Sequence, residues 1–411
     1  MSAVRILRLA TGGDGVGRLE DGRTVFVPRT APGDLVDLVQ LRVHRRFARA
    51  RLGQLVEAGA DRVAPRCPHY DGDDCGGCQL QHLDSAAQRT ARRSFVGDAL
   101  RRLGGLELPD PPIVPAPEDW SYRSKLTLHI SADRRRIGLH PLDRPDRVFD
   151  LLWCHIADAR LMELWQQVRR RRELLPEGLE RLVLRLDRAG ALHVLASVRG
   201  AAVWADAAAL GRSLAAAGTP ATLWWEPAGG AARAVAGSGE PFPATVFEQV
   251  HPAMGDRARL AALAALGNVD GQHVWDLYAG IGDTTNELLA RGASVESVEA
   301  DTRAVRFAER RGPADRARVI RHAGRVEDLL RELRDPVLVV TNPPRTGMDE
   351  RVTEGLRLRG PRRIVYISCD PATLARDIRR LGGGYRVAGV QAFDLFPQTA
   401  HVESVTVLEA A

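Results

Sequence analysis

Residues 273–283 read HVWDLYAGIGD, and this segment decides the fold of the C-terminal part of the chain. Its apolar start is typical of a buried strand. Gly280 and Gly282 follow where a helix begins, so the backbone there can approach a ligand closely. The next apolar run ends at Glu299, where an acid can accept both hydroxyls of an adenosine ribose. The order of strand, glycine turn, helix, strand and acid predicts a nucleoside-binding loop.

The same turn favours S-adenosylmethionine over a dinucleotide. A dinucleotide fingerprint has a third glycine, and Thr285 stands at that place. A glycine pair alone is a weak signal, because plain tight turns use it too, but helices and strands alternate along the whole region. The expected strands are 273–277, 294–298, 337–340, 364–368 and 404–408, and the expected helices are 258–266, 284–291, 303–311, 348–358 and 371–381. This alternation predicts a Rossmann-like α/β domain with a parallel sheet.

Residues 1–60 have a different pattern, with short apolar runs such as 24–27 and 35–39 between glycine-rich turns. Regularly spaced short strands predict a small β-barrel. Its last part carries basic side chains around Phe47 and no acid, and these are Arg42, His44, Arg45, Arg46, Arg49 and Arg51. Such a strand face is either simply solvated or in contact with RNA, and the sequence favours neither.

The positive net charge of the chain is compatible with a polyanionic partner such as nucleic acid, but it is weak evidence for one. The formal net charge is +6, but almost all the positive charge is arginine, because Lys125 is the only lysine, and this indicates a coding bias. No stretch reaches the ~18 apolar residues of a membrane helix, and the start has no signal-peptide pattern. We therefore expect a cytoplasmic protein with reduced thiols, in which the five cysteines serve metal binding or catalysis.

Cys369 is placed for catalysis. It follows the expected strand 364–368, and Asp370 and Pro371 are typical of a helix start. A lone cysteine in a strand is more often a buried structural residue. The carboxyl end of a strand in an α/β sheet, however, is where ligands bind, and a helix N-terminus can lower a thiol pKa. We therefore expect a reactive thiolate here. Glu403, which begins the last strand, is a candidate base, although a lone glutamate there is usually solvated.

Together these motifs resemble the RNA uracil-5 methyltransferase family, whose members modify 23S ribosomal RNA or the tRNA T-loop. The matching stretches are 75–82 (CGGCQLQH), 247–250 (FEQV), 276–282 (DLYAGIG), 342–345 (NPPR), 368–377 (SCDPATLARD) and 396–404 (FPQTAHVES). The first 60 residues resemble a TRAM domain, an RNA-binding barrel. The resemblance implies a multidomain α/β protein: a TRAM-like barrel at 1–60, a cluster-bearing central domain at 61–245 and a catalytic domain at 246–411. It also implies that residues 84–110 pack with the catalytic domain, and we expect a monomer.

The resemblance also implies residue roles. Cys369 would be the nucleophile and Glu403 the base. Cofactor or substrate positions would be Gln249, Tyr278, Gly280, Gly282, Asp283, Glu299 and Asn342. The chemistry explains the pair, because C5 of uracil is too weak a nucleophile to attack a sulfonium methyl group. A thiolate that adds to C6 makes C5 an enolate carbon, and a base then removes the C5 proton so that the thiol can leave.

The other four cysteines suggest a metal centre. Cys67, Cys75 and Cys78 lie within twelve residues, and Cys154 remains once Cys369 is assigned to catalysis. Four thiolates suit zinc and a [4Fe–4S] cluster equally by ligand type. The resemblance favours the iron–sulfur cluster, in a structural role, since methyl transfer needs no electrons.

The chain leaves the family pattern at positions that bear on the cofactor and the target base. Asn342 stands for Asp, His251 for Asn, Asp283 for Asn or Thr and Gly324 for a polar residue, and the gap from Cys67 to Cys75 is long. We expect methylation of a uridine at C5, with 23S ribosomal RNA favoured over the tRNA T-loop.

Two further functions stay open. An exocyclic-amine methyltransferase would use an N-P-P-[Tyr/Phe] loop, but Arg345 replaces the aromatic residue, and that chemistry needs no thiol. The other is an RNA-binding module without activity, against which the intact Cys369 and the glycine loop argue.

Overall fold

The computed structural model describes residues 3–200, 203–237, 246–311 and 316–411, and the chain divides into two compact units. Unit 1 comprises Met1–Gln88, Pro117–Thr245 and Pro397–Ala400, and unit 2 comprises Arg89–Ala116, Val246–Phe396 and His401–Ala411. The three-domain boundaries expected from the sequence stay predictions. Within the described ranges, no helix is both long and apolar enough to cross a membrane.

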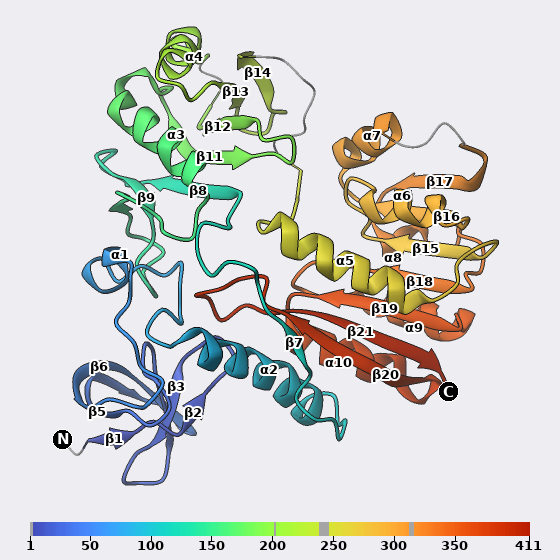
Figure 1. Cartoon of the computed structure of the whole chain (residues 1–411), viewed down its shortest axis with the longest axis horizontal. Helices are drawn as coiled ribbons and strands as arrows, with labels where there is room; N and C mark the ends of the chain where they lie inside the picture. The colour runs from blue at the N-terminus through green and yellow to red at the C-terminus, as the bar shows by residue number, and fades with distance from the viewer. Residues whose placement is uncertain (1–2, 201–202, 238–245, 312–315) are drawn as a thin grey trace. The chain divides into compact units, whose positions relative to one another are not determined.

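Unit 1 begins with a six-stranded sheet (Figure 1, blue). Its strands are β1 (Val4–Arg5), β2 (Arg8–Leu9), β3 (Gly15–Arg18), β4 (Thr24–Val27), β5 (Leu35–Val43) and β6 (Phe47–Glu57), in the order β1-β5-β6-β4-β3-β2. Alternate residues of β4 and β5 point inward, and they form a small core that includes Val25, Val27, Val36 and Leu38. The expected strands at 24–27 and 35–39 are therefore confirmed.

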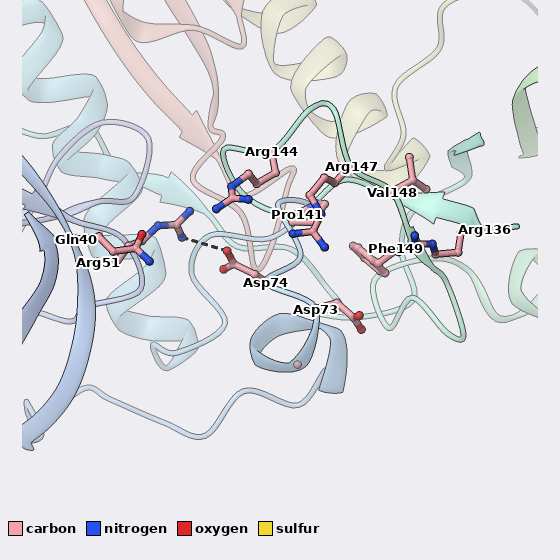
Figure 2. Close-up of a pocket in the computed structure, with 11 residues that line it drawn as sticks. Gln40, Arg51, Asp73, Asp74, Arg136, Pro141, Arg144, Arg147, Val148 and Phe149 are labelled. Carbon is pink, nitrogen blue, oxygen red and sulfur yellow. Dashed lines mark hydrogen bonds and ion pairs between the residues drawn. The ribbon is translucent and has the colours of Figure 1, made fainter. Parts of the chain in front are cut away.

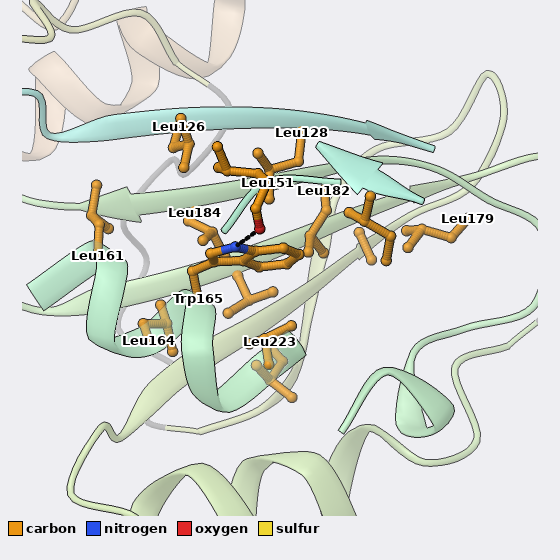
Figure 3. Packing of buried hydrophobic residues seen from close by; sticks show 14 of the residues in the cluster. Leu126, Leu128, Leu151, Leu161, Leu164, Trp165, Leu179, Leu182, Leu184 and Leu223 are labelled. Carbon is orange, nitrogen blue, oxygen red and sulfur yellow. Dashed lines mark hydrogen bonds between the residues drawn. The ribbon is translucent and has the colours of Figure 1, made fainter. Parts of the chain in front are cut away.

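The rest of unit 1 is built on a seven-stranded sheet of order β10-β9-β8-β11-β12-β13-β14. Its strands are β8 (Lys125–Ile130), β9 (Ile137–Leu139), β10 (Phe149–Asp150), β11 (Leu179–Leu186), β12 (Leu192–Val198), β13 (Ala221–Glu226) and β14 (Arg233–Ala236). The helices are α1 (Pro68–Gly72), α3 (Ala159–Arg170), the short η1 (Arg172–Leu174) and α4 (Ala207–Ala216). Figure 3 shows Trp165 of α3 among leucines of the sheet, with its indole nitrogen donating to the Leu151 carbonyl at 2.9 Å.

Unit 2 is an eight-stranded sheet of order β17-β16-β15-β18-β19-β21-β20-β7. Its strands are β7 (Ile113–Val114), β15 (His273–Leu277), β16 (Ser294–Glu299), β17 (Val319–Ala323), β18 (Leu338–Thr341), β19 (Arg363–Ser368), β20 (Tyr385–Phe393) and β21 (Glu403–Ala410). The helices are α2 (Ser85–Arg102, in unit 2 from Arg89), α5 (Pro252–Leu266), α6 (Asp283–Ala290), α7 (Thr302–Arg311), α8 (Val326–Leu329), α9 (Glu350–Arg359) and α10 (Pro371–Leu381), with η2 (Arg316–Arg318) and η3 (Gly382–Gly384).

Helices cover both faces of this sheet (Figure 1). Residues of α5 and α6 pack on one face, and residues of α2, α8, α9 and α10 pack on the other. Because both faces are covered, β18 is buried along its whole length and β19 along nearly all of its length, and neither strand shows an alternating pattern of burial. On α2, the Arg92 guanidinium pairs with Asp394 at 2.7 Å, and both side chains are fully buried.

The sheet differs from the expected one in two ways. Strands β15 to β19 are parallel to one another, but β21 runs antiparallel to β19 and β20, and β7 pairs in parallel with β20. Moreover, three strands of the sheet were not expected, namely β7, β17 and β20. In β17, Arg321 and His322 interrupt the apolar pattern. It is an edge strand, and Ile320 is 45% exposed. Edge strands bury less surface, so their sequences carry a weaker signal.

Candidate active site

The site is set by the order of the strands. The chain moves outward from β15 to β16 and β17 and then returns to β18, which lies beside β15. In open α/β sheets, ligands bind at the carboxyl ends of the strands where the order reverses in this way. The loops after β15 and β18 meet there, and the Asn342 amide donates to the Leu277 carbonyl at 3.2 Å. Cys369 follows β19, the next strand along.

The glycine loop after β15 has a left-handed backbone at three residues. Tyr278, Gly280 and Gly282 have φ values of 61°, 56° and 81°. A Cβ on Gly282 would stand 3.0 Å from the Ala308 Cβ, so the close approach of α7 also favours glycine. A left-handed tyrosine is unusual, and such strained residues gather at functional sites.

Glu299 is held at the end of β16 by this loop. One carboxylate oxygen accepts from the Gly280 amide at 2.8 Å, and the other accepts from the Asp301 amide at 2.8 Å. The Gly324 amide donates to the Glu299 carbonyl at 2.9 Å, so the residue that leaves the family pattern lies beside this acid. The remaining lone pairs of the Glu299 carboxylate stay free to accept from ligand hydroxyls.

A buried carboxyl lies beneath the loop. Asp276 on β15 accepts from the Thr285 hydroxyl of α6 at 2.5 Å, and burial raises the pKa of Asp276 to about 7. Thr285 is fully buried, so the residue in place of the third glycine links α6 to the strand. This bond fixes the turn that carries Gly280 and Gly282.

The other expected cofactor positions have different surroundings. Asp283 at the start of α6 pairs with Arg259 at 3.3 Å and with Arg311 at 3.5 Å, so its carboxylate already has cations beside it. Gln249 is half-buried before α5, and its side chain lies against Gly255, where an added Cβ would stand 2.8 Å away. His251 is buried, and burial lowers its pKa to about 4, so it is neutral near pH 7.

Register places Cys369 opposite Glu403. Ser368 of β19 pairs with Ser404 of the antiparallel β21, so the next residue of one strand faces the preceding residue of the other. Cys369 and Glu403 are that next pair, and their charges influence each other. The structure therefore brings together two residues that lie 34 positions apart in the sequence.

Glu403 is a buried acid whose carboxylate has no hydrogen bond to any residue that the structure describes. It is 1% exposed, and neither carboxylate oxygen accepts a hydrogen bond from any residue in the described ranges. Burial raises the pKa of Glu403 to about 8, although the nearby Arg345 guanidinium lowers it. A carboxylate with a raised pKa is a stronger base, and its free oxygens can take a proton from a ligand.

The expectation of a lowered thiol pKa at Cys369 is wrong for the protein alone. Burial, and to a smaller extent the charge of Glu403, raise the pKa of Cys369 to about 11, although Arg345 lowers it. The helix N-terminus has little effect, because the Asp370 carboxylate already accepts from the Ala372 and Thr373 amides at 3.0 and 2.9 Å. The desolvated thiol is therefore protonated until a ligand or a cation stabilises its anion.

Arg345 lies in the site, although the sequence predicted no catalytic or binding role for it. Its guanidinium lowers the pKa of both Cys369 and Glu403, so it lies near both. It is exposed and forms no ion pair with any described residue. The sequence could have indicated this role, because Arg345 stands in the loop after a central strand, and ligands bind at such loops.

Asn342 and Arg345 belong to a loop that α10 holds in place. The Met348 amide and the Tyr366 hydroxyl both donate to Asp377 Oδ2, at 2.7 and 2.9 Å. Asp377 is fully buried. The side-chain amide of Asn342 makes no hydrogen bond to a described residue, so its donor and acceptor remain available to a ligand.

The other four cysteines gather in unit 1. Cys67 and Cys78 are buried in one cluster with Tyr122 and Ile156, and Cys154 packs against it. Cys75 is close enough that the charges of Cys67 and Cys154 affect its pKa. All four are free thiols. Among the described residues, however, no three His, Cys, Asp or Glu side chains are arranged so that they could hold a metal ion.

Comparisons with known proteins agree with this geometry. Residues 317–411 match the family described as tRNA (Uracil-5-)-methyltransferase, and residues 3–52 match the TRAM domain. An uncharacterized RNA methyltransferase of Gloeobacter violaceus is 34% identical over 99% of this chain and 96% of its own length. The 23S rRNA (uracil(1939)-C(5))-methyltransferase RlmD of Thiobacillus denitrificans is 31% identical over 99% of both chains.

A solved structure has the same fold. The Pyrococcus abyssi tRNA (uracil-54, C5)-methyltransferase, in complex with S-adenosyl-L-homocysteine, is 22% identical and has a TM-score of 0.74 over 98% of this chain and 100% of that chain. The expected fold class, with an N-terminal TRAM domain and a Rossmann-like methyltransferase domain, is therefore confirmed.

Proposed function

The chain belongs to the RNA uracil-5 methyltransferase family, and we propose that it transfers a methyl group from S-adenosylmethionine to C5 of a uridine in 23S ribosomal RNA. The observation that carries this proposal is the facing pair of Cys369 and Glu403 at the carboxyl edge of the sheet. An amino methyltransferase needs neither a thiol nor a buried base beside it.

The two residues divide the reaction between them. The Cys369 thiolate forms a bond to C6 of the uracil, and the C5=C6 electron pair moves toward C5 and O4. C5 then takes the methyl group from the sulfonium. Glu403 removes the C5 proton, the C5=C6 bond re-forms, and the S–C6 bond breaks to release the thiolate. Both residues end in the state in which they began, once Glu403 gives its proton to solvent.

The neighbouring residues favour this sequence of steps. The thiol must first lose its proton to solvent, and the guanidinium of Arg345 favours the thiolate because it lowers the pKa of Cys369. For the cosubstrate, the Glu299 carboxylate would accept from the ribose hydroxyls, and the loop from Tyr278 to Gly282 would lie along the nucleoside. Gln249, Asp283 and Asn342 are further proposed contacts. The ion pairs of Asp283 favour an indirect role for it, in holding α6.

Relatives named for 23S rRNA support that substrate. They are 31% and 32% identical to this chain over nearly its whole length, whereas the likeness to the solved tRNA enzyme is one of fold. The tRNA T-loop remains the second candidate. Mapping 5-methyluridine in ribosomal and transfer RNA from a deletion strain, with and without the restored gene, separates the two.

The covalent mechanism has a direct test. RNA with 5-fluorouridine at the target should trap a covalent adduct, because fluorine cannot leave as a proton. Cys369→Ala should abolish both the adduct and turnover. Glu403→Gln should still methylate C5 but then stall with the RNA bound. Normal turnover by Cys369→Ala would overturn the mechanism.

For the cysteines of unit 1, we propose a [4Fe–4S] cluster held by Cys67, Cys75, Cys78 and Cys154. Three buried thiols and the partly buried thiol of Cys154 fit this group in ligand type, and a cluster there would stabilise the loops that carry them. Anaerobically purified protein should be brown and contain iron and sulfide. Colourless protein with one zinc ion per chain would overturn the choice of metal.

A cytoplasmic location and a monomeric state also remain proposals.

A further inference from the structure

A cavity of about 420 Å³ lies within unit 1, and none of its lining residues belongs to the candidate active site (Figure 2). Three segments line it: the barrel strands with Gln40 and Arg51, residues 72–74 after α1, and residues 136–149 around β9 and β10. Four arginines line it, namely Arg51, Arg136, Arg144 and Arg147. A concave site rich in guanidinium groups attracts anions.

The two acids in the lining already have polar partners within unit 1. Asp73 lies 2.6 Å from the ring nitrogen of His69. Asp74 lies 3.1 Å from a guanidinium nitrogen of Arg29 and 3.2 Å from one of Arg51. The Asp74 charge is therefore balanced by Arg29 and Arg51, and among the described residues neither acid forms an ion pair with Arg144 or Arg147.

Arg144 and Arg147 have no such partners. Neither guanidinium forms an ion pair or a hydrogen bond with any residue in the described ranges, and both side chains are exposed. Arg136 is 3.6 Å from Asp133, and Asp143 is 3.5 Å from Arg51. In Figure 2 the side chains of Arg144 and Arg147 reach down from the loop toward the segment with Asp74. Two exposed cations at one cavity are thus left for a ligand.

The loop that carries them is held in place by backbone hydrogen bonds. The Gly76 amide donates to the His140 carbonyl at 3.0 Å, and the Leu142 amide donates to the Asp74 carbonyl at 2.7 Å. From the barrel, Arg51 donates to the Leu142 carbonyl at 3.1 Å. Because the loop is fixed at its start, the two arginines lose less freedom when they bind.

The barrel contributes an unusual residue. Gln40 has a left-handed backbone, with φ of 50°, at an irregularity of the β5–β6 pairing, and its side chain lines the cavity. A non-glycine residue in this conformation is strained, and such strain is often found at binding sites. Its amide can donate to an anion beside the guanidinium groups.

We propose that this cavity binds a backbone phosphate of the RNA substrate. The inference rests on the proposed function. Guanidinium groups bind phosphate oxygens through two parallel hydrogen bonds, which suits a phosphodiester. The single aromatic ring in the lining, Phe149, is buried, so the cavity offers no exposed ring on which a base could stack. The contact is therefore to the backbone and independent of sequence.

The test compares two double variants of the full chain. Arg144→Ala/Arg147→Ala removes the cavity arginines, and Arg170→Ala/Arg212→Ala removes two exposed arginines of unit 1 that do not line it. The net charge changes equally, so a general electrostatic effect would be the same in both. A fluorescein-labelled RNA stem-loop with a uridine in its loop is titrated at several salt concentrations, and the anisotropy gives the Kd.

The cavity variant should weaken binding about tenfold or more, and its slope of log Kd against log salt should fall by about one to two, since about one counterion is released per phosphate contact. The control variant should change the Kd by less than about twofold. KM for RNA should rise in the cavity variant while kcat stays near that of the unmodified protein. Unfolding midpoints should match, because the removed side chains are exposed.

Three outcomes would overturn the inference. Equal weakening in both variants would mean that only the total charge matters, and unchanged binding by the cavity variant would mean that RNA does not contact it. Tight binding of inorganic phosphate, lost in the cavity variant without a change in RNA affinity, would assign the cavity to a free anion. If RNA binding depends on the cavity but no uridine is methylated, the inference holds and the proposed function fails.

Discussion

Replacing Glu403 by glutamine should make the protein more stable at alkaline pH while it stops the catalytic cycle. The glutamate is buried, and no described residue donates a hydrogen bond to its carboxylate. Glutamine has nearly the same size and shape but carries no charge at any pH. The substitution therefore removes the cost of a buried anion without opening a cavity.

The magnitude follows from the pKa of Glu403, which burial raises from 4.5 to about 8. Each pKa unit corresponds to about 1.4 kcal/mol, so ionising this carboxyl costs the folded state at most about 5 kcal/mol relative to the unfolded chain. Because the folded-state pKa is raised, the folded protein binds more protons than the unfolded chain between these two values. The contribution of Glu403 to the free energy of unfolding is therefore fully present below pH 4.5, and it is lost as the pH rises through about 8.

Urea unfolding at about pH 5 and about pH 9, followed by circular dichroism, measures the effect. The difference in unfolding free energy between Glu403→Gln and the unmodified protein should grow by about 3–5 kcal/mol from the lower to the higher pH. A matched control lies on the same strand, where ion pairs with Arg363 and Arg386 lower the pKa of Glu409. Because a lowered pKa gives stability that is already present above about pH 4.5, Glu409→Gln should lose about the same stability at both pH values.

Equal pH dependence in Glu403→Gln and the unmodified protein would refute this reasoning. It would mean that the carboxyl ionises as easily in the folded protein as in water, and Glu403 would then have no unusual basicity for proton removal from C5. Comparison of the two pH values cancels the cost of burying the glutamine amide, since that cost does not depend on pH.

Other residues give further predictions. Arg345→Gln should raise the pKa of Cys369, so adduct formation with 5-fluorouridine RNA should need a higher pH, and an unchanged pH–rate profile would contradict this. Asn342→Asp should keep uridine activity within about tenfold, or ~1.4 kcal/mol of transition-state binding. With matched RNAs, preference of the unmodified protein for cytosine would reject the uridine assignment. Arg92→Ala should cost about 3–5 kcal/mol, because Asp394 would stay buried without the guanidinium at 2.7 Å, and an unchanged urea midpoint would disagree.

Local patterns in the sequence were sufficient for much of the fold. The glycine loop with Glu299, the parallel strands β15, β16, β18 and β19, and the barrel strand β4 each carry a signal within a few residues: apolar periodicity, a turn glycine or a helix cap. The proposed reactive pair was likewise chosen from the sequence, since Cys369 and Glu403 stand in recognisable motifs. Strands, turns and helix ends depend on steric restrictions between neighbouring residues and on which side chains of the element are apolar. Residues that are close together in the sequence determine both.

Other features depend on contacts between distant segments, and only the tertiary structure decides them. The antiparallel β21 places Glu403 opposite Cys369, and no local pattern specifies that register. The raised pKa of Cys369 arises from burial and from Glu403, which outweigh the helix N-terminus that the sequence suggested. The arginine cavity likewise depends on a loop that backbone hydrogen bonds hold against the cysteine segment. Desolvation and charge pairing are set by all the groups around a residue in space, so they become readable only once the chain has folded.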